Sequence, residues 1–549
     1  MGDKYLSEVI TADDIKNSKE NAICIVSGVG SGKNYFVENV LYEECGKSIL
    51  YITSRRAKAD EILKDTDAVR KIDWNKADSM VTLTNSGVQY LLASRTEQYP
   101  VKDMINHFDY FVLDEAHSIA TDATFTDAAF HVRSLIEHVI KNYHNKKVIL
   151  MTGTPEPIED YLNKKISEKY RWKVIDKRDE CISVRPKEIR LISKKQAMGI
   201  IKRLTNDKKT IYMANSATAI LSDEGIIKDL CKSRNINRED VMYKMSLEKM
   251  AELEKNKRKE EVEYNKNMLE KLKCSSRIPE EIKILVTTSS LKEGINIKNE
   301  DINIVFCESH FLADIIQFAG RVRKGVDVLY IISDAKQNFR GLDDKRNTLY
   351  TYYECKYLKE SANQYIEYLK DPNNAMYSGL VGYDNEMLDM YHILQGDCGL
   401  HNYVETVRHF VDYMNGKTSA IKYNYITQCF EPDILRNHEI RRLYKEIDIL
   451  LEDKIKEYCV KNNIRFGSNK QLMRNLMRRY MVECIKGNVK IFEDEKKKII
   501  SIIQIAENVS ENPKIATVNK ILEEYNIKYK FESKTDKKTK KRYWAIEEL

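Results

Sequence analysis

The chain has 549 residues, of which 42% are hydrophobic and 32% charged, and 91 basic against 84 acidic residues leave a formal net charge of +7. Such a length predicts about two to four domains, and the near balance of charge permits a polyanionic partner without requiring one. Eleven scattered cysteines with no CxxC pair argue against a zinc site or a disulfide framework. No apolar run approaches the roughly 18 residues of a membrane span, and residues 1–6 lack the apolar core of a signal peptide, so we expect a cytoplasmic protein without a membrane partner.

The first predicted element is an apolar strand over residues 22–26, followed by a glycine-rich loop and a segment with helical spacing over 35–41. Strand, glycine-rich loop and helix are the context of a phosphate-binding loop, because successive backbone N–H groups can then turn toward one anion. The candidate nucleotide-binding residues of this loop are Gly28, Val29, Gly30, Ser31, Gly32, Lys33 and Asn34. Ser27 and Asn34 depart from the usual pattern, which has Gly or Ala first and Ser or Thr after the lysine. An ordinary glycine-rich turn is the alternative.

Strands and helices alternate up to about residue 185, which predicts a parallel α/β sheet. A strand over 48–52 ends in Thr53-Ser54-Arg55-Arg56, and a strand at 81–86 carries Thr84 near its end. Arg55 and Thr84 are candidate contacts to a nucleic-acid backbone. A helix start with solvated charges explains the first of these segments equally well.

A buried strand over 110–113 is followed by Asp114, Glu115, Ala116 and His117. In open α/β sheets the carboxyl ends of the strands are where ligands bind. Asp114 is placed to hold Mg²⁺, and Glu115 to orient and deprotonate the attacking water. The plain alternative is a strand end with solvated acids and a packing histidine, but the phosphate loop upstream favours the catalytic interpretation.

A further strand over 148–151 leads into Thr152-Gly153-Thr154-Pro155, which places two hydroxyl groups beside these acids. At this point the residues resemble superfamily 2 helicases and translocases, and the tetrad at 114–117 is similar to the DEAH-box pattern. Residues 27–34 resemble motif I, the acids motif II, and Thr152 to Thr154 motif III. The resemblance implies that Thr152, Thr154 and His117 couple nucleotide state to movement.

The resemblance also predicts a second core domain with further motifs. Residues 209–216 resemble motif IV, and 287–297 resemble motif V. In motif V, Thr287 and Thr288 would contact the nucleic-acid backbone, while Glu293, Gly294 and Asn296 would face the nucleotide. Residues 317–325 resemble motif VI, the arginine-finger helix.

Motif VI implies that Gln317 helps to position water and that Arg321 and Arg323 stabilise charge on the transferred phosphate. The family places its second arginine three residues after the first, whereas Arg323 follows by two and Lys324 by three. Arg321 is therefore the firmer arginine finger. A basic surface helix is the alternative interpretation.

The fold expected from these patterns is α/β, with two RecA-like parallel-sheet domains in tandem, then a helical region and a small α+β unit. Expected boundaries are 1–185 for the ATP-binding domain and 186–340 for the second core domain, with a charged helical insertion near 247–273. A helical accessory domain over 341–510 and a basic-hairpin unit over 511–549 complete the layout.

Two basic regions of the last third leave alternatives open. The stretch 462–487 carries five basic side chains on helical spacing, which suits either phosphate tracking or an ordinary charged face. The tail has a helix and then two strands around a basic turn, residues 534–541, and this resembles a winged-helix wing. A solvated turn is the alternative there.

The resemblance implies an ATP hydrolase that uses Mg²⁺ and moves along nucleic acid, with DNA favoured over RNA. The layout is reminiscent of replication helicases of phages, plasmids and viruses of the origin-binding type, which suggests replication or mobile-element proteins as partners. An ATP-gated nucleic-acid binder or loading factor, and a scaffold with a weakened ATPase, are the competing classes of function.

Overall fold

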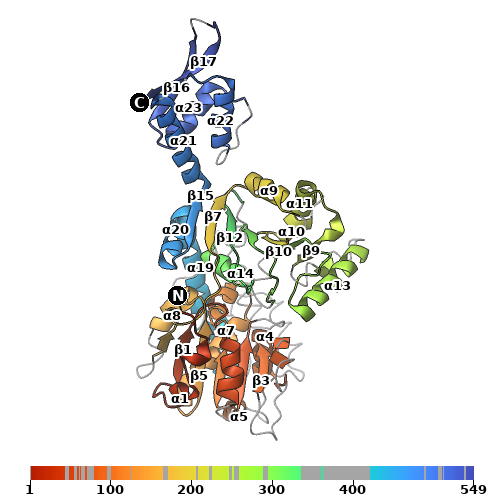
Figure 1. Ribbon diagram of the computed structural model, residues 1–549. Helices are drawn as coiled ribbons and strands as arrows, with labels where there is room; N and C mark the ends of the chain where they lie inside the picture. Colours follow the sequence, from red (N-terminus) through yellow and green to blue (C-terminus); the bar gives the residue numbers. More distant parts are fainter. Residues whose placement is uncertain are drawn as a thin grey trace, which may run out of the picture. The chain divides into compact units, whose positions relative to one another are not determined.

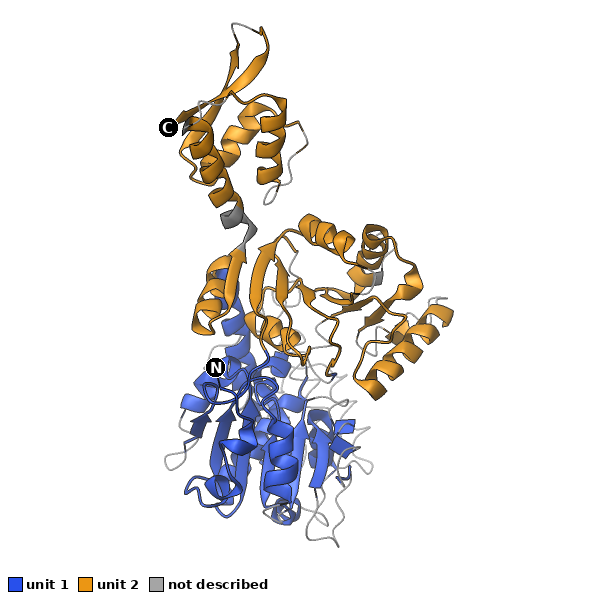
Figure 2. Ribbon diagram, in the orientation of Figure 1, with its two compact units in different colours: residues 1–184, 293–295, 339–448 blue, residues 185–292, 296–338, 449–549 orange. Residues whose placement is uncertain are grey.

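The computed structural model describes residues 2–43, 48–54, 59–60, 62–63, 68–70, 80–94, 101–124, 126–164, 171–205, 208–221, 225–245, 250–252, 259–288, 295–335, 360, 363, 421–486, 490–504, 510, 512–536 and 539–548. The chain forms two compact units (Figure 2). Unit 1 comprises residues 1–184, 293–295 and 339–448, and unit 2 comprises 185–292, 296–338 and 449–549. No helix among the described residues is both long and apolar enough to cross a bilayer.

Unit 1 is built on a six-stranded, fully parallel sheet with the order β3-β2-β4-β5-β1-β6 (Figure 1). Its strands are β1 Ala22–Val26, β2 Ile49–Thr53, β3 Met80–Thr84, β4 Tyr110–Leu113, β5 Lys147–Thr152 and β6 Lys173–Asp176. β1, β2 and β4 are buried along their whole length, as strands of a parallel sheet covered on both faces must be.

Two hydrophobic cores lie on opposite faces of this sheet, because alternate residues of β1 enter different clusters. One face is covered by α1 Ala12–Lys16 and by the helix that follows the glycine-rich loop, which runs from α2 Lys33–Tyr35 into the π-helical turn η2 Phe36–Tyr42. The other face is covered by α4 Asn85–Ala93, α5 Val101–His107, α6 Ser118–Thr121 and α7 Ala128–Asn142. Shorter turns connect these elements: η1 Leu6–Glu8, η3 Asp122–Thr124, η4 Glu156–Ile158 and α8 Glu159–Asn163.

A later stretch of the chain completes unit 1. The hairpin β13 Ile421–Asn424 and β14 Cys429–Pro432 leads into α19 Ile434–Asp448. Leu435 of α19 belongs to the same core as β1 and α7, and Lys422 of β13 pairs with Asp127 at the start of α7. These residues lie within the range expected to form a separate helical domain.

Unit 2 contains a second parallel sheet of seven strands, ordered β15-β7-β12-β11-β8-β10-β9. Its strands are β7 Glu188–Ile192, β8 Thr210–Met213, β9 Val241–Lys244, β10 Ile284–Thr287, β11 Ile304–Cys307, β12 Val328–Ile332 and β15 Arg465–Ser468. Its helices and turns are α9 Lys194–Arg203, α10 Ala217–Leu221, α11 Ile226–Arg234, η5 Arg238–Asp240, α13 Lys259–Ser275, α14 Leu312–Ala319 and α20 Leu451–Lys461. The expected fold of two tandem RecA-like α/β domains is therefore confirmed.

The charged segment expected as an insertion contains α13, and this helix covers the edge strand β9. Val262, Met268 and Leu272 of α13 are buried. The side-chain amide of Asn265 accepts a hydrogen bond from the backbone N–H of Tyr243 and donates one to its carbonyl, both 2.8 Å long. An asparagine thus satisfies the backbone of an edge strand as a neighbouring strand would.

The end of the chain folds around a core of its own. α21 Asn469–Lys486, α22 Glu493–Ile503 and α23 Ile515–Glu524 pack with the antiparallel hairpin β16 Tyr529–Thr535 and β17 Arg542–Glu548 (Figure 1). The expected domain ranges stay a prediction. The structure adds that this tail begins before residue 511, that β15 belongs to the second sheet, and that residues 421–448 belong to unit 1.

Candidate nucleotide-binding site

The glycine-rich loop lies at the carboxyl end of β1, as its sequence predicts. The Lys33 ammonium group folds back over the loop and donates a 3.2 Å hydrogen bond to the Gly28 carbonyl. Gly30 and Gly32 have φ angles of 82° and 84°, which only glycine adopts without strain. A Cβ atom on Gly28 would lie 2.6 Å from the carbonyl oxygen of Ile182, so this position also needs glycine. The lysine side chain is only 8% exposed, and its charge is held at the loop rather than in solvent.

Strand order brings the loop and the acids to one edge of the sheet. β5 lies between β1 and β4, and both flanking strands continue to pair with it beyond their ends. The Ser27 N–H donates to the Thr152 carbonyl at 3.1 Å, and the Ala116 N–H donates to the Met151 carbonyl at 2.8 Å. The three predicted motifs of unit 1 are therefore neighbours at the carboxyl end of the sheet.

Asp114 and Glu115 differ sharply in their surroundings. Asp114 is 3% exposed, whereas the Glu115 side chain is 24% exposed. Glu115 also has a positive φ of 49°, a conformation that costs a non-glycine residue energy and tends to occur at functional sites. One carboxylate is thus fixed in the protein and the other faces partly outward, which suits a metal ligand and a base for water, respectively.

His117 links the acids to the turn after β5. Its Nδ1 atom lies 3.1 Å from the Thr152 hydroxyl and 3.6 Å from the Glu115 carboxylate, and the histidine is buried. The Thr152 hydroxyl also accepts a hydrogen bond from the Thr154 N–H at 3.1 Å. The residues assigned to coupling therefore form one hydrogen-bonded chain inside unit 1.

Asn34 is held by a residue that sequence reasoning missed. The hydroxyl of Tyr51, in the middle of β2, donates a 3.3 Å hydrogen bond to Asn34 Oδ1. Burial, followed by the Asp114 carboxylate and its hydrogen bond with Tyr51, raises the pKa of this hydroxyl well above its usual value. The hydroxyl therefore stays protonated and lies within reach of both predicted metal ligands.

The residues present fit a magnesium ion. Mg²⁺ binds hard oxygen ligands, and proteins commonly supply only one or two of these beside the nucleotide phosphates. Asp114 offers a carboxylate oxygen and Asn34 an amide oxygen, and both approach the same Tyr51 hydroxyl. Within the described ranges there is no cluster of three His, Cys, Asp or Glu side chains that would instead suggest a transition-metal cage.

The predicted nucleic-acid contacts of unit 1 are less informative. Thr84 caps α4, since its hydroxyl accepts a 3.1 Å hydrogen bond from the Gly87 N–H. Helix capping alone accounts for a threonine at this position. A contact between Thr84 and a nucleic-acid backbone stays a prediction. Arg55 lies outside the described residues.

In unit 2 the structure joins motifs V and VI through one side-chain pair. The Arg323 guanidinium donates to Asn296 Oδ1 through Nε at 2.9 Å and Nη2 at 2.5 Å. Lys324, the residue at the spacing usual for the family, is instead exposed and pairs with Glu300 at 2.9 Å. The departure in spacing therefore places Arg323, rather than Lys324, against motif V.

The other predicted residues of unit 2 that the structure describes lie on or just after α14 and at the end of β10. Gln317 and Arg321 are 7% and 8% exposed, and α14 ends at Ala319, so both arginines lie just after the helix rather than on it. The Thr287 hydroxyl donates to the Lys244 carbonyl, and the Thr288 N–H donates to the same oxygen. Glu293 and Gly294 lie outside the described residues.

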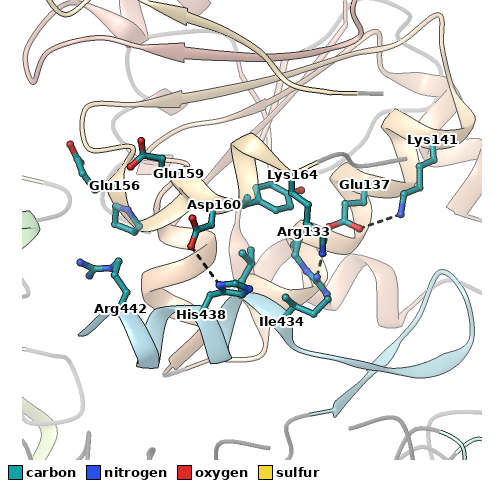
Figure 3. Close-up of a pocket in the computed structure, with 13 residues that line it drawn as sticks. Arg133, Glu137, Lys141, Glu156, Glu159, Asp160, Lys164, Ile434, His438 and Arg442 are labelled. Atoms are coloured by element: carbon teal, nitrogen blue, oxygen red, sulfur yellow. Dashed lines mark hydrogen bonds and ion pairs between the residues drawn. The ribbon is translucent and has the colours of Figure 1, made fainter. Parts of the chain in front are cut away.

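A cavity of about 640 Å³ lies elsewhere in unit 1, between α7, α8 and α19 (Figure 3). Basic and acidic side chains alternate around it: Asp160 points toward His438 at 3.7 Å, and Arg133 toward Glu137 at 3.8 Å. None of its lining residues belongs to the glycine-rich loop or the acid tetrad. We interpret it as a polar seam between α19 and the first domain.

Together, the parallel sheet, the glycine-rich loop with Lys33 over it and the acids at a neighbouring strand end define an α/β domain whose candidate site has the residue types that bind phosphates. No protein-family profile and no curated protein sequence matches the chain. Solved structures that are similar include the DUF1998 helicase MrfA bound to DNA and AMPPNP, with 16% identity over 59% of this chain and 47% of that one, at a TM-score of 0.39.

The helicase Lhr of Mycobacterium smegmatis bound to ssDNA and AMP-PNP is similar with 10% identity over 77% of this chain and 58% of its own, at a TM-score of 0.40. The DEAD-box helicase Mss116 bound to ssRNA and UDP-BeF is similar with 15% identity, covering 74% and 82%, at a TM-score of 0.40. The chain thus spans about half the length of the first two structures.

Proposed function

We propose that this protein is an ATP-dependent helicase or translocase that acts on nucleic acid, with DNA as the favoured substrate. The observation that carries the proposal is the meeting of three features at one sheet edge. These are the buried Lys33 over the glycine-rich loop, the buried Asp114, and the hydrogen bond between His117 and Thr152. Each feature alone has a structural explanation, whereas their combination matches what hydrolysis of a nucleoside triphosphate requires.

Each residue has a distinct task in this proposal. The loop amides and Lys33 hold the phosphates, and Glu115 orients and deprotonates the attacking water. Asp114 and Asn34 hold Mg²⁺, which would supply charge neutralisation on the phosphate oxygens when bound. From unit 2, Gln317 helps to position the water, and Asn296 and Arg323 act as a nucleotide-facing pair.

Arg321 is the residue that we assign to charge stabilisation on the transferred phosphoryl group. A guanidinium in this role typically accelerates the reaction by about 10³- to 10⁵-fold. Cycles of nucleotide binding and hydrolysis would then drive movement along a strand. Thr287, Thr288, Thr84 and Arg55 stay candidate contacts to the nucleic-acid backbone, and Glu293 and Gly294 stay candidate nucleotide contacts.

We also propose a subgroup of helicases for this protein. The tetrad Asp114 to His117 supports a DEAH-box-like group, and the layout suggests a replication helicase of the origin-binding type with replication or mobile-element proteins as partners. An ATP-gated binder without unwinding activity is the second candidate, because Asn34 stands where a Ser or Thr residue usually ligates Mg²⁺.

The decisive experiment measures ATP hydrolysis by the full chain with ssDNA, dsDNA, ssRNA and dsRNA as activators. We expect stimulation by DNA, and a loss of at least about 100-fold in Lys33→Ala and in Glu115→Gln. Stimulated hydrolysis that survives both substitutions would refute the site. A strand-displacement assay on a partly duplex substrate then separates a helicase from an ATP-gated binder.

A further inference from the structure

The tail of the chain, residues 469–548, contains a third extended segment, at Ile491, that its sequence did not suggest. Ile491 forms an antiparallel bridge with Trp544 of β17: the Ile491 N–H donates to the Trp544 carbonyl at 3.2 Å, and the reverse bond is 2.9 Å. The elements therefore follow one another as helix, strand, helix, helix, strand, strand, with β17 between Ile491 and β16. This is the order of a winged-helix module.

The module has an interior of its own. Side chains from all three helices and both hairpin strands form one buried cluster, which includes Met477, Ile499, Val518, Phe531 and Trp544. Asn519 of α23 fixes the hairpin, because its side-chain amide bonds both the N–H and the carbonyl of Phe531 at 2.8 and 2.9 Å. The hairpin is thus attached to α23 by side-chain hydrogen bonds.

Charge along the hairpin is distributed unevenly. Near its base Lys530 pairs with Glu547 at 2.9 Å, and Lys534 lies 3.7 Å from Glu532. Toward the tip the sequence from Lys534 to Arg542 contains six basic residues and one acid. In the described part of that tip, Lys540, Lys541 and Arg542 are exposed and have no carboxylate within ion-pair distance. Acidic side chains therefore neutralise the lysines near the base of the hairpin, whereas the described basic residues of the tip stay available to a partner.

The single acid of the tip serves the turn itself. Asp536 is 6% exposed, and its carboxylate accepts hydrogen bonds from the Thr539 N–H at 2.7 Å and the Thr539 hydroxyl at 3.1 Å. It also pairs with Lys490, which precedes the Ile491 bridge. The carboxylate therefore helps to hold the turn in shape.

Lys540 occupies a strained position within this turn. Its φ angle is 58°, in the left-handed region that glycine and asparagine adopt far more readily. A lysine is a costly choice for such a turn if shape is the only requirement. The shape of the turn therefore does not explain the lysine.

We infer that this module is a second nucleic-acid contact, in which the exposed basic residues Lys540, Lys541 and Arg542 bind the phosphates of a B-form DNA duplex. The major groove of B-DNA admits a two-stranded β-ribbon, whereas the corresponding groove of an RNA duplex is too deep and narrow for side chains to read. Charges concentrated at the end of a ribbon can reach the phosphates at the groove edges. The contact is separate from the nucleotide site and requires no ATP.

The test compares two charge-removing variants of the full chain by fluorescence anisotropy without nucleotide. The tip variant is Lys540→Asn with Lys541→Gln and Arg542→Gln. Asparagine tolerates the left-handed backbone, so this variant keeps or improves the turn while removing its charge. The matched control removes three exposed lysines from the same module but away from the tip: Lys497→Gln, Lys498→Gln and Lys520→Gln.

We expect the tip variant to bind a 30-base-pair DNA duplex at least about tenfold more weakly than the natural chain, with the salt slope reduced by about two to three. Binding to single-stranded DNA and to duplex RNA should change by less than about twofold, as should duplex binding by the control. Equal losses in both variants, equal losses on single strands or RNA, or no loss in the tip variant would each overturn the inference. Because binding is measured without nucleotide, this test is independent of the ATPase proposal.

Discussion

The Tyr51 hydroxyl donates a 3.3 Å hydrogen bond to Asn34 Oδ1 and also interacts with Asp114, so one buried tyrosine touches both residues predicted to hold Mg²⁺. An amide oxygen is a weaker electrostatic ligand than a carboxylate and is free to rotate away. A fixed donor from the sheet limits that rotation. Tyr51 thereby offers a physical reason why asparagine can stand where a hydroxyl residue is usual.

Replacement of Tyr51 with phenylalanine should therefore weaken metal-dependent nucleotide binding. A neutral hydrogen bond contributes about 1 kcal/mol, so we expect the Mg²⁺ concentration for half-maximal binding of a fluorescent ATP analogue to rise about fivefold in Tyr51→Phe. Binding measured in excess chelator should not change, because the loop amides and Lys33 are untouched.

The matched control for this variant is Tyr161→Phe, which removes another buried tyrosine hydroxyl of unit 1 outside the loop. It should leave the Mg²⁺ dependence unchanged. If Tyr51→Phe alters affinity equally with and without Mg²⁺, the tyrosine acts only on loop packing and its role at the metal ligands is wrong.

A second prediction concerns the bond between His117 and Thr152. Thr152→Val keeps the shape of the side chain but leaves the buried imidazole nitrogen and the Thr154 N–H without their shared partner. An unsatisfied buried polar group costs about 1–3 kcal/mol, which favours rearrangement of the turn. We expect the stimulation of hydrolysis by DNA to fall about tenfold, with basal hydrolysis nearly unchanged.

The measurement is the ratio of stimulated to basal ATPase rates across a titration of DNA. Ser134→Ala is a suitable control, because it removes a buried hydroxyl whose bond stays within α7. A proportional fall of both rates in Thr152→Val would show that the hydrogen bond supports hydrolysis itself and not its coupling to DNA.

Sequence reasoning succeeded for the fold and for the places of the loop and the acids after their strands. The loop from Gly28 to Lys33 and the acids at 114–115 each follow a buried strand, so one stretch of sequence predicts the motif and its place at the sheet edge. Alternation of strands and helices likewise predicted the first parallel sheet, and the family resemblance predicted the second. Local patterns sufficed there because the chemistry is carried by contiguous residues.

Contacts between distant segments could not be predicted in this way. From sequence, Tyr51 is predicted only as a buried strand residue. Its hydroxyl reaches Asp114 because β2 pairs with β4 in the sheet. Similarly, β15 gives no sign that it will join β7, nor Ile491 that it will pair with Trp544. A single bridge has no periodic signal, because it involves too few residues.

A third prediction tests the network of ion pairs within α19. Arg442 bridges Glu439 and Glu446 at 2.8 Å, and these two carboxylates are 2% and 9% exposed. Because the two carboxylates raise the pKa of Arg442 further despite its desolvation, the arginine is always charged. Arg442→Met would leave two buried acids unpaired and should destabilise unit 1 by about 3 kcal/mol.

Arg479→Met is the control for this substitution, because Arg479 forms the same kind of helical pair with Glu483 at the surface, where both side chains are mostly exposed. Its loss should cost less than about 0.5 kcal/mol. Thermal unfolding of the two variants, followed by circular dichroism, compares them directly. If Arg442→Met destabilises the protein no more than Arg479→Met does, the buried ion pairs of Arg442 do not stabilise α19 as proposed.

The last prediction concerns Asp433, at the start of α19. Burial raises the pKa of this carboxyl, and the nearby Arg133, Lys422 and Arg436 only partly oppose that effect. A raised pKa in the folded state means that ionisation disfavours folding, so stability falls as the pH rises above the ordinary value of 3.8. Asp433→Asn keeps an acceptor for the Arg436 N–H, which Asp433 now binds at 3.3 Å, and removes the charge.

We therefore expect the α19 amides of Asp433→Asn to exchange hydrogen more slowly than those of the natural chain at pH 7, and at the same rate near pH 4. Asp14 provides a control of opposite sign, because hydrogen bonds from Thr11 lower the pKa of its carboxyl. Stability from Asp14 is present at neutral pH and is lost as the pH falls, so Asp14→Asn should speed exchange around α1 at pH 7. Faster exchange in Asp433→Asn at neutral pH would mean that attraction from the nearby basic side chains outweighs the burial of Asp433.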